Sequence, residues 1–316
     1  MLNVLFHAFN LGHRGGTNSL RDYAIYNQKI LGNRSTILYH TKGQQASEPD
    51  VIESLSKQFE LIPVTSNSEV DPLVKSYDVV YSQRSGYDEE PSIRSAPFLL
   101  HGVFCNYTDQ CTRFAYISKY LSNRMRPETP YIPYMIDLPS SNKNLRKELN
   151  ISGDQFVFGR IGGWQEFDIP FVKETIKKIL TQRSDIVFVF INTQPFIEHS
   201  NVIYLPSSFD QQFKSNFINS CDAMIHGREM GETFGLAMME FLYFNKPVLA
   251  WEKGNDLNHV EVLQPFDLLY NSDNVAEKIY DLVDNRRSFD FSTVVAEYTP
   301  ANVMNKFNEV FFYGIK

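Results

Sequence analysis

Short apolar strands alternate with helical stretches along this chain, in two successive series. The first series begins with strand-like residues 4–9 and 35–39, and its strands recur as far as residues 114–118. A polar stretch at residues 140–144 interrupts the pattern, and a second series starts at residues 155–159. Strands joined by helical crossovers form parallel, doubly wound sheets. The alternation therefore predicts an α/β chain with two Rossmann-like domains in succession.

The chain is long enough for this arrangement, because 316 residues make two domains of ordinary size. The polar stretch sets the expected boundary, with an N-terminal domain at residues 1–139 and a C-terminal domain at residues 140–299. A last helix is expected within residues 300–316. In doubly wound sheets, ligands bind at the carboxyl ends of the strands. We therefore expect the functional site in a cleft between the two domains.

Composition and charge exclude several functional classes. The apolar and charged contents, 43% and 21%, are those of a folded soluble protein. A net charge of −7 argues against nucleic acid as a partner. The chain begins without a signal-peptide pattern, and no apolar run reaches the ~18 residues of a transmembrane segment. These features predict a cytoplasmic protein and leave peripheral contact with a membrane open.

The stretch from Asp222 to Trp251 carries the strongest functional signal. Glu232 and Glu240 are separated by seven residues, and a helix-forming segment lies between them. Apolar strands flank this segment, so the local order is strand, glycine-bearing loop, helix, strand. Free N–H groups at the helix start would form an anion site, and Glu240 would follow Glu232 by two turns near the same face. This pattern suits a ligand with both phosphates and hydroxyls, as in a sugar nucleotide.

The same stretch resembles the C-terminal signature of retaining GT-B glycosyltransferases of family 4, which is Glu, seven residues and a second Glu. Gly231, the run Phe234 to Leu236 and the turn Asn245 to Val248 strengthen the resemblance. It implies two Rossmann-like, doubly wound domains that face a central cleft. The N-terminal domain would hold the acceptor and the C-terminal domain the donor. The last helix, at residues 300–316, would cross back to the N-terminal domain.

The resemblance also implies roles for individual residues of this signature. Glu232 would contact the donor sugar, and Glu240 would contact the ribose. The diphosphate would be bound by backbone amides of the four residues that follow the first glutamate, namely Thr233, Phe234, Gly235 and Leu236.

Residues outside the signature also match the family. Arg160 ends the first strand of the second series, where the family's arginine holds the diphosphate with its planar, permanently charged fork. Gly15 and Gly16 belong to a glycine-rich turn that would reach the donor, although a plain flexible loop is an alternative. His101 lies at a strand end and would contact the transferred sugar or the reacting centre. A histidine at such a position can instead be a hydrogen-bonded structural residue.

One departure from the family concerns the diphosphate. A lysine normally follows the arginine by several residues, but residues 161–168 contain no lysine, and Glu166 lies near the expected position. This places the charge balance or the activity in doubt. Arg228 is the candidate replacement, because the family usually has small residues there. Its alternative role is that of a surface or structural arginine.

Together these features predict a glycosyltransferase that moves a hexosyl or pentosyl group from a UDP- or GDP-sugar to a hydroxyl group, with retention. The acceptor would be a glycan, a lipid or a small molecule. The resemblance implies that no metal and no further cofactor are needed, and the sequence contains no Asp-x-Asp triplet to hold a metal. Two alternatives remain. One is a non-catalytic sugar-nucleotide-binding protein or inactive partner subunit, and the other is a different GT-B enzyme such as a sugar-nucleotide epimerase.

Overall fold

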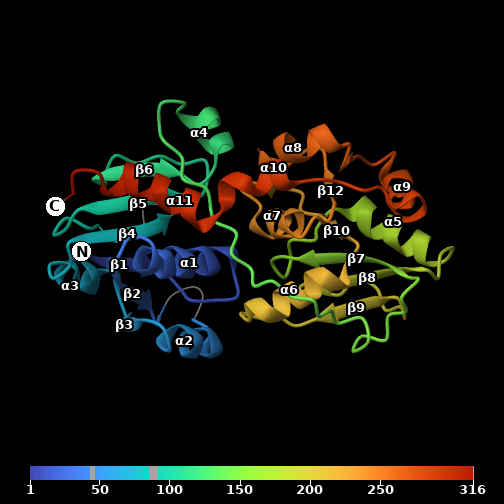
Figure 1. Ribbon diagram of the computed structural model, residues 1–316, viewed down its shortest axis with the longest axis horizontal. Helices are drawn as coiled ribbons and strands as arrows, with labels where there is room; N and C mark the ends of the chain where they lie inside the picture. Colours follow the sequence, from blue (N-terminus) through green and yellow to red (C-terminus); the bar gives the residue numbers. More distant parts are fainter. Residues whose placement is uncertain (43–46, 85–91, 316) are drawn as a thin grey trace. The chain divides into compact units, whose positions relative to one another are not determined.

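The computed structural model describes residues 1–42, 47–84 and 92–315. The chain divides into two compact units, of which the first comprises Met1–Asp137 together with Tyr298–Lys316 and the second comprises Leu138–Glu297. Helix α11 (Pro300–Phe307) therefore belongs to the first unit, where it contacts α1 (Gly15–Lys29). In Figure 1 the red α11 lies among the blue and cyan elements of this unit. The two ends of the chain thus complete one unit.

The first unit contains a six-stranded sheet in the order β3-β2-β1-β4-β5-β6, in which every neighbouring pair is parallel. Its strands are β1 (Asn3–Ala8), β2 (Arg34–His40), β3 (Glu60–Val64), β4 (Val79–Arg84), β5 (Phe98–Gly102) and β6 (Arg113–Tyr116). The remaining helices are α2 (Pro49–Ser56), α3 (Val70–Val74), α4 (Lys119–Met125), the short η1 (Asn67–Glu69) and the π-helical η4 (Asn308–Phe312).

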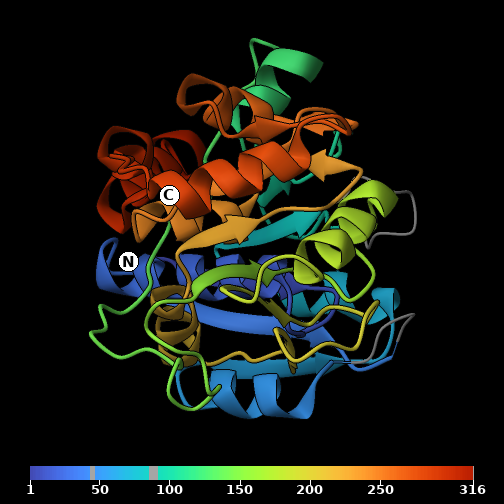
Figure 2. The same cartoon turned by 90° about the vertical axis from the view of Figure 1, so that its right-hand side faces the viewer.

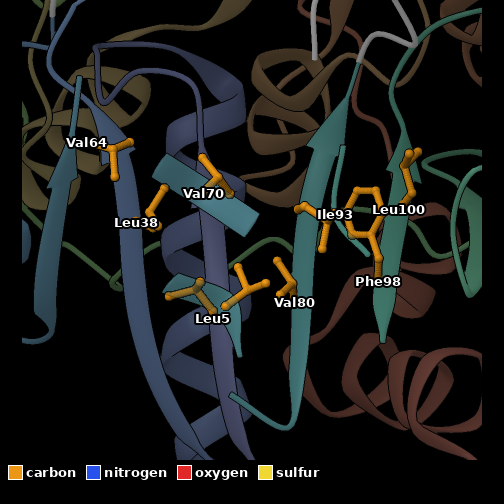
Figure 3. Packing of buried hydrophobic residues seen from close by; sticks show 9 residues of the cluster. Leu5, Leu38, Val64, Val70, Val80, Ile93, Phe98 and Leu100 are labelled. Atoms are coloured by element: carbon orange, nitrogen blue, oxygen red, sulfur yellow. The ribbon is translucent and has the colours of Figure 1, made fainter. Parts of the chain in front are cut away.

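Successive side chains of each strand point to opposite faces of this sheet, and both faces are buried. One face carries a hydrophobic cluster, which Figure 3 shows close up: Leu5, Leu38, Val64, Val70, Val80, Ile93, Phe98 and Leu100. The other face carries a set of aromatic rings contributed by β1, β4, β5, α1 and the C-terminal segment: Phe6, Tyr81, His101, Tyr23, Phe307 and Phe311. Two-sided burial explains the nearly continuous apolar runs in the sequence.

The second unit repeats the architecture, with a parallel six-stranded sheet in the order β14-β12-β10-β7-β8-β9. Its strands are β7 (Phe156–Ile161), β8 (Ile186–Ile191), β9 (Val202–Leu205), β10 (Ala223–Ile225), β12 (Val248–Trp251) and β14 (Leu269–Tyr270). A separate parallel pair joins β11 (Gly231–Glu232) to β13 (Asp256–Leu257). The helices are α5 (Pro170–Leu180), α6 (Gln211–Ser220), α7 (Leu236–Tyr243), α8 (Asn258–Leu263), α9 (Val275–Asn285) and α10 (Ser292–Val295), with the 3-10 turns η2 (Gln264–Phe266) and η3 (Ala296–Tyr298). Helices α5 and α9 lie side by side (Figures 1 and 2).

Each sheet has a point at which the strand order reverses. In sequence order within each unit, both sheets read 3-2-1-4-5-6, the order of a doubly wound dinucleotide-binding sheet. The reversal lies between β1 and β4 in the first sheet and between β7 and β10 in the second. Ligands bind outside the carboxyl ends of the strands at such a point.

Among the described residues, no helix is long and apolar enough to cross a membrane.

Candidate functional site

Arg160 lies on β7, next to the reversal point of the second sheet, and its side chain is almost fully enclosed. The residue is 4% exposed, and its guanidinium donates to the carbonyl of Gly163 at 3.1 Å and to the carbonyl of Asn192 at 3.3 Å. The hydroxyl of Thr193 accepts a further bond. Burial lowers the pKa of Arg160 to about 10, so the guanidinium stays protonated near neutral pH. None of the described carboxylates forms an ion pair with it, so its partners are neutral.

The loop after β7 fits tightly around this guanidinium. A Cβ atom on Gly162 would lie 2.3 Å from a guanidinium nitrogen of Arg160, so a side chain there would displace the arginine. The next residue, Gly163, donates its amide to a Glu166 carboxylate oxygen at 3.1 Å. Glu166 therefore belongs to the same loop and brings a negative charge to the position at which the resemblance predicted a lysine.

Arg228 follows β10 and lies between two carboxylates. One terminal nitrogen of its guanidinium is 3.2 Å from a Glu166 oxygen, and the other is 3.3 Å from Glu232 Oε2. The Arg228 side chain is 21% exposed, which distinguishes it from the enclosed Arg160. The structure thus brings Arg160, Glu166, Arg228 and Glu232 together at the carboxyl ends of β7 and β10. Two cations and two carboxylates share this edge of the sheet.

Glu232 is fixed at both carboxylate oxygens. His226 Nε2 donates to Oε1 at 3.0 Å, while Oε2 pairs with Arg228. Burial raises the pKa of Glu232, but the His226 hydrogen bond and the charges of His226 and Arg228 act in the opposite direction and hold it below its ordinary value. The His226 ring also stacks on His259, and burial together with His226 lowers the pKa of His259 to about 4. Glu232, whose side chain is 19% exposed, is consequently held as an ionised carboxylate.

The backbone around Glu232 differs from the expected helix. Glu232 lies in the short strand β11, and α7 begins only at Leu236, after Gly235 with φ of 83°. The prediction that Glu232 and Glu240 share a helix face is therefore wrong, because the left-handed glycine separates the loop from the helix. Thr233 and Phe234 lie in that loop, and the Phe234 carbonyl accepts from Asn258 at 2.7 Å. The N-cap residue of α7 is Gly235, which has no side chain with which to cap the helix.

Glu240 lies inside α7 and is 4% exposed. Its Oε1 accepts from Lys214 Nζ of α6 at 2.7 Å, and the two side chains are both nearly buried. Glu240 thus lies in the same unit as Arg160, Arg228 and Glu232, but it is held by a partner of its own.

The residues predicted in the first unit are arranged differently. His101 is fully buried, its Nε2 donates to the Ile132 carbonyl at 2.8 Å, and its Nδ1 accepts from the Tyr81 hydroxyl at 2.8 Å. Burial lowers the pKa of His101 to about 4. Both ring nitrogens are therefore used inside the unit, which favours the structural alternative over the predicted contact with a sugar. Gly15 and Gly16 are exposed, but they are the first residues of α1 rather than part of a preceding loop.

Sequence reasoning missed Lys214, His226, His259 and Asn258. Lys214 and Asn258 carry no local signal, because their partners are 26 and 24 residues away in the chain. His226 had a signal, since it follows the strand β10 directly and lies next to Gly227 and Arg228. Among the described residues, no group of three or more His, Cys, Asp and Glu side chains is placed to hold a metal ion.

Comparison with solved structures identifies the fold. The chain is similar to HepE from Anabaena in complex with UDP and glucose, with a TM-score of 0.69, 14% identity, and coverage of 98% of this chain and 96% of that one. It is similar to a glycosyltransferase from Rickettsia africae, with a TM-score of 0.66, 13% identity, and coverage of 98% and 94%. A Listeria monocytogenes protein assigned as a UDP-N-acetylglucosamine 2-epimerase gives a TM-score of 0.63, 12% identity, and coverage of 96% and 94%.

No family model and no curated protein matches the sequence. At these identities the likeness establishes the fold alone. Two parallel six-stranded sheets with alternating helices, matched along nearly the whole length of such neighbours, make this chain a protein of GT-B fold.

Proposed function

We propose that this chain is a metal-independent glycosyltransferase that moves a hexosyl or pentosyl group from a nucleoside diphosphate sugar to a hydroxyl group, with retention. The observation that carries the proposal is the convergence of Arg160, Arg228 and Glu232 at the reversal point of the second sheet. The comparison with HepE, a structure that contains UDP and glucose, supports the choice of donor class. His101 is not part of the proposed site.

The diphosphate is assigned to the cationic part of this edge. A buried guanidinium with only neutral partners is costly, and an anion placed beside it offsets that cost. Arg160 meets this description, and the N-terminus of α7, which begins after Gly235, adds a helix dipole that favours an anion. Charge on the diphosphate grows as it leaves the sugar, so cations fixed in place stabilise the transition state more than the ground state.

Donor binding would exchange the partners of Arg228 and Glu232. In the unliganded protein, Arg228 occupies Glu232 Oε2, while the shorter His226 bond holds Oε1. A diphosphate would draw Arg228 away, and Oε2 would then accept a hydrogen bond from a hydroxyl group of the donor sugar. His226 keeps the carboxylate oriented throughout. In this way Arg228 takes the role of the missing lysine, and phosphate binding prepares the sugar contact.

Incubation of the purified protein with UDP- and GDP-sugars tests this function. We expect saturable binding of one nucleoside diphosphate by calorimetry, and release of that nucleoside diphosphate when a hydroxyl acceptor is present. NMR of the new glycosidic bond should show the anomeric configuration of the donor, and EDTA should leave turnover unchanged. An inverted product would refute retention, and loss of turnover that Mn²⁺ or Mg²⁺ restores would refute metal independence.

Epimerisation of a sugar nucleotide is the second candidate. The close pair of His226 and Glu232 supplies a basic and an acidic group in one place, and one structural neighbour is assigned as an epimerase. Inversion of the configuration at a single carbon of the sugar nucleotide, in the absence of an acceptor, would favour this reaction. Binding of the nucleotide sugar without transfer or epimerisation would instead favour the non-catalytic protein.

A further inference from the structure

We propose that Asn192 is a positioning residue that fixes the guanidinium of Arg160 for the leaving diphosphate. This inference rests on the proposed function, because it assumes that Arg160 binds that diphosphate. It assigns a role to the side chain and to the backbone conformation of Asn192, which acts through Arg160 rather than on the ligand itself.

Asn192 directly follows β8, and its backbone turns out of the strand conformation. Its amide still donates to the Leu205 carbonyl of β9 at 3.0 Å, but its φ is 51°. Residues other than glycine seldom adopt this left-handed conformation, and asparagine tolerates it better than most. In this conformation the Asn192 carbonyl accepts from Arg160 Nη1 at 3.3 Å. The hydroxyl of Thr193, the next residue, accepts from the same nitrogen.

The side chain of Asn192 joins the loop after β8 to the loop after β7. Its Nδ2 donates to the Gly162 carbonyl at 2.9 Å. Gly162 lies against the guanidinium of Arg160, because a Cβ atom there would clash with it. The carbonyl of Gly163 accepts from both terminal nitrogens of Arg160 at 3.1 Å. Asn192 therefore holds Arg160 directly through its carbonyl and indirectly through the loop that carries Gly162.

This double hold is more than the end of a strand requires. A residue that merely ended β8 would need the left-handed backbone, but it would not need a side-chain bond to Gly162. A buried cation stabilises charge that develops in a transition state best when it is already aimed at that charge, because reorientation costs free energy. Arg160 is 4% exposed and has neutral partners, so these hydrogen bonds decide where it points.

Asn192→Gly separates the two roles. Glycine adopts the left-handed conformation without strain, so the variant should fold with a denaturation midpoint close to that of the wild type. We expect kcat for sugar transfer to fall by at least about tenfold, while the KM for the donor changes less than about threefold, because a displaced Arg160 loses stabilisation of the transition state. Asn150→Gly is the matched control, since Asn150 has a φ of 56°, lies in the same unit and is exposed. Its kcat should be unchanged.

A double-mutant cycle shows whether Asn192 acts through Arg160. In the Arg160→Met background, Asn192→Gly should lower kcat no further, because the group that it positions is gone. Rate losses that multiply in the double variant would show that the two residues act independently and would overturn the inference. An unchanged kcat in the single variant Asn192→Gly would overturn it as well.

A measurement without substrate separates this inference from the proposed function. NMR of the isotope-labelled protein follows hydrogen exchange of the Arg160 Nε–H group, whose resonance is identified by its loss in Arg160→Met. We expect this exchange to quicken at least about tenfold in Asn192→Gly and to stay unchanged in Asn150→Gly. Unchanged exchange in Asn192→Gly would mean that Arg160 is held without Asn192, and the inference would be wrong. Faster exchange in a protein whose wild type transfers no sugar would support the positioning and refute the proposed function.

Discussion

The two units have the same strand order but use the edges of their sheets differently. In the second unit, the carboxyl ends of β7 and β10 gather Arg160, Arg228 and Glu232. In the first unit, His101 lies on β5, one strand beyond β4, and both of its ring nitrogens form hydrogen bonds within that unit. The same topology therefore supports a charged sheet edge in one case and an enclosed hydrogen-bonded histidine in the other. Position at a strand end does not establish function without the contacts of the side chain.

The edge of the first sheet nearest its reversal point carries a different set of groups. His7 on β1 shares hydrogen bonds with Ser82 at 3.1 Å and with His40 at 3.0 Å, and the exposed Phe9 stacks on His40. Burial, followed by the charges of Arg84 and His40, lowers the pKa of His7 well below its ordinary value. This histidine-rich and aromatic edge, which includes Arg84, contrasts with the paired charges at the edge of the second unit, where we propose that the diphosphate binds.

The largest effect is expected when the enclosed cation of the second unit is removed. Arg160→Met should slow sugar transfer by about 10²–10³-fold, because stabilisation of the leaving charge is lost. Steady-state kinetics with the donor identified by calorimetry measures this. Arg183→Met is a matched control, since Arg183 is paired with Asp185 and Asp284 near the start of β8. Equal rates in both variants would remove Arg160 from the site.

Acid should destabilise the first unit through His101. Its folded pKa of about 4 lies below the ordinary 6.5, so the unfolded chain binds more protons between these values. The contribution of neutral His101 to the free energy of unfolding is complete above pH 6.5. Roughly 3 kcal/mol of it is lost as the pH falls toward 4. Denaturant unfolding followed by far-UV circular dichroism at several pH values measures this loss, and His101→Gln should reduce it.

The second unit provides an internal control for this measurement. Both tryptophans of the chain, Trp164 and Trp251, lie in it, so their fluorescence follows that unit alone. The fluorescence-detected pH dependence should be unchanged in His101→Gln, and His259→Gln should alter it because the pKa of His259 is also about 4. A fluorescence change in His101→Gln equal to that seen by circular dichroism would show that the units do not respond separately.

Glu232 should act on the sugar more than on the nucleotide. Glu232→Gln removes the charged acceptor for a sugar hydroxyl, so binding of the nucleotide sugar should weaken by about 1.5–3 kcal/mol. Binding of the free nucleoside diphosphate should weaken much less, because the phosphate contacts remain. Calorimetry with both ligands gives the comparison, and an equal loss for the two would place Glu232 away from the sugar.

The smallest effect is expected from a substitution that supplies the lysine predicted by the resemblance. Glu166→Lys removes one of the two carboxylates that hold Arg228 and adds a cation to the loop after β7. Because Glu166 is 44% exposed, we expect tighter binding of the nucleoside diphosphate by only about 1 kcal/mol or less. The gain should decrease as salt is raised. Weaker binding in this variant would mean that Glu166 contributes to the site rather than replacing a lost cation.

The sequence was sufficient for the architecture because strands buried on both faces leave continuous apolar runs, such as Ile186 to Ile191. It also placed Arg160, Arg228 and Glu232 at strand ends and glycine loops, where the structure brings them together, while their roles stay predictions. It did not reveal tertiary partners that are distant in the chain. His101 depends on Ile132, which is 31 residues away, and Glu240 depends on Lys214, which is 26 residues away. The helix start was misplaced because the left-handed conformation of Gly235 has no periodic signal.

A crystal structure with the bound nucleoside diphosphate tests the central claim most directly. The account predicts that the Arg228 guanidinium lies within hydrogen-bond distance of a phosphate oxygen and has left Glu232 Oε2. It also predicts that the diphosphate lies at the carboxyl ends of β7 and β10, beside the N-terminus of α7. A diphosphate elsewhere, with Arg228 still paired to Glu166 and Glu232, would contradict the account.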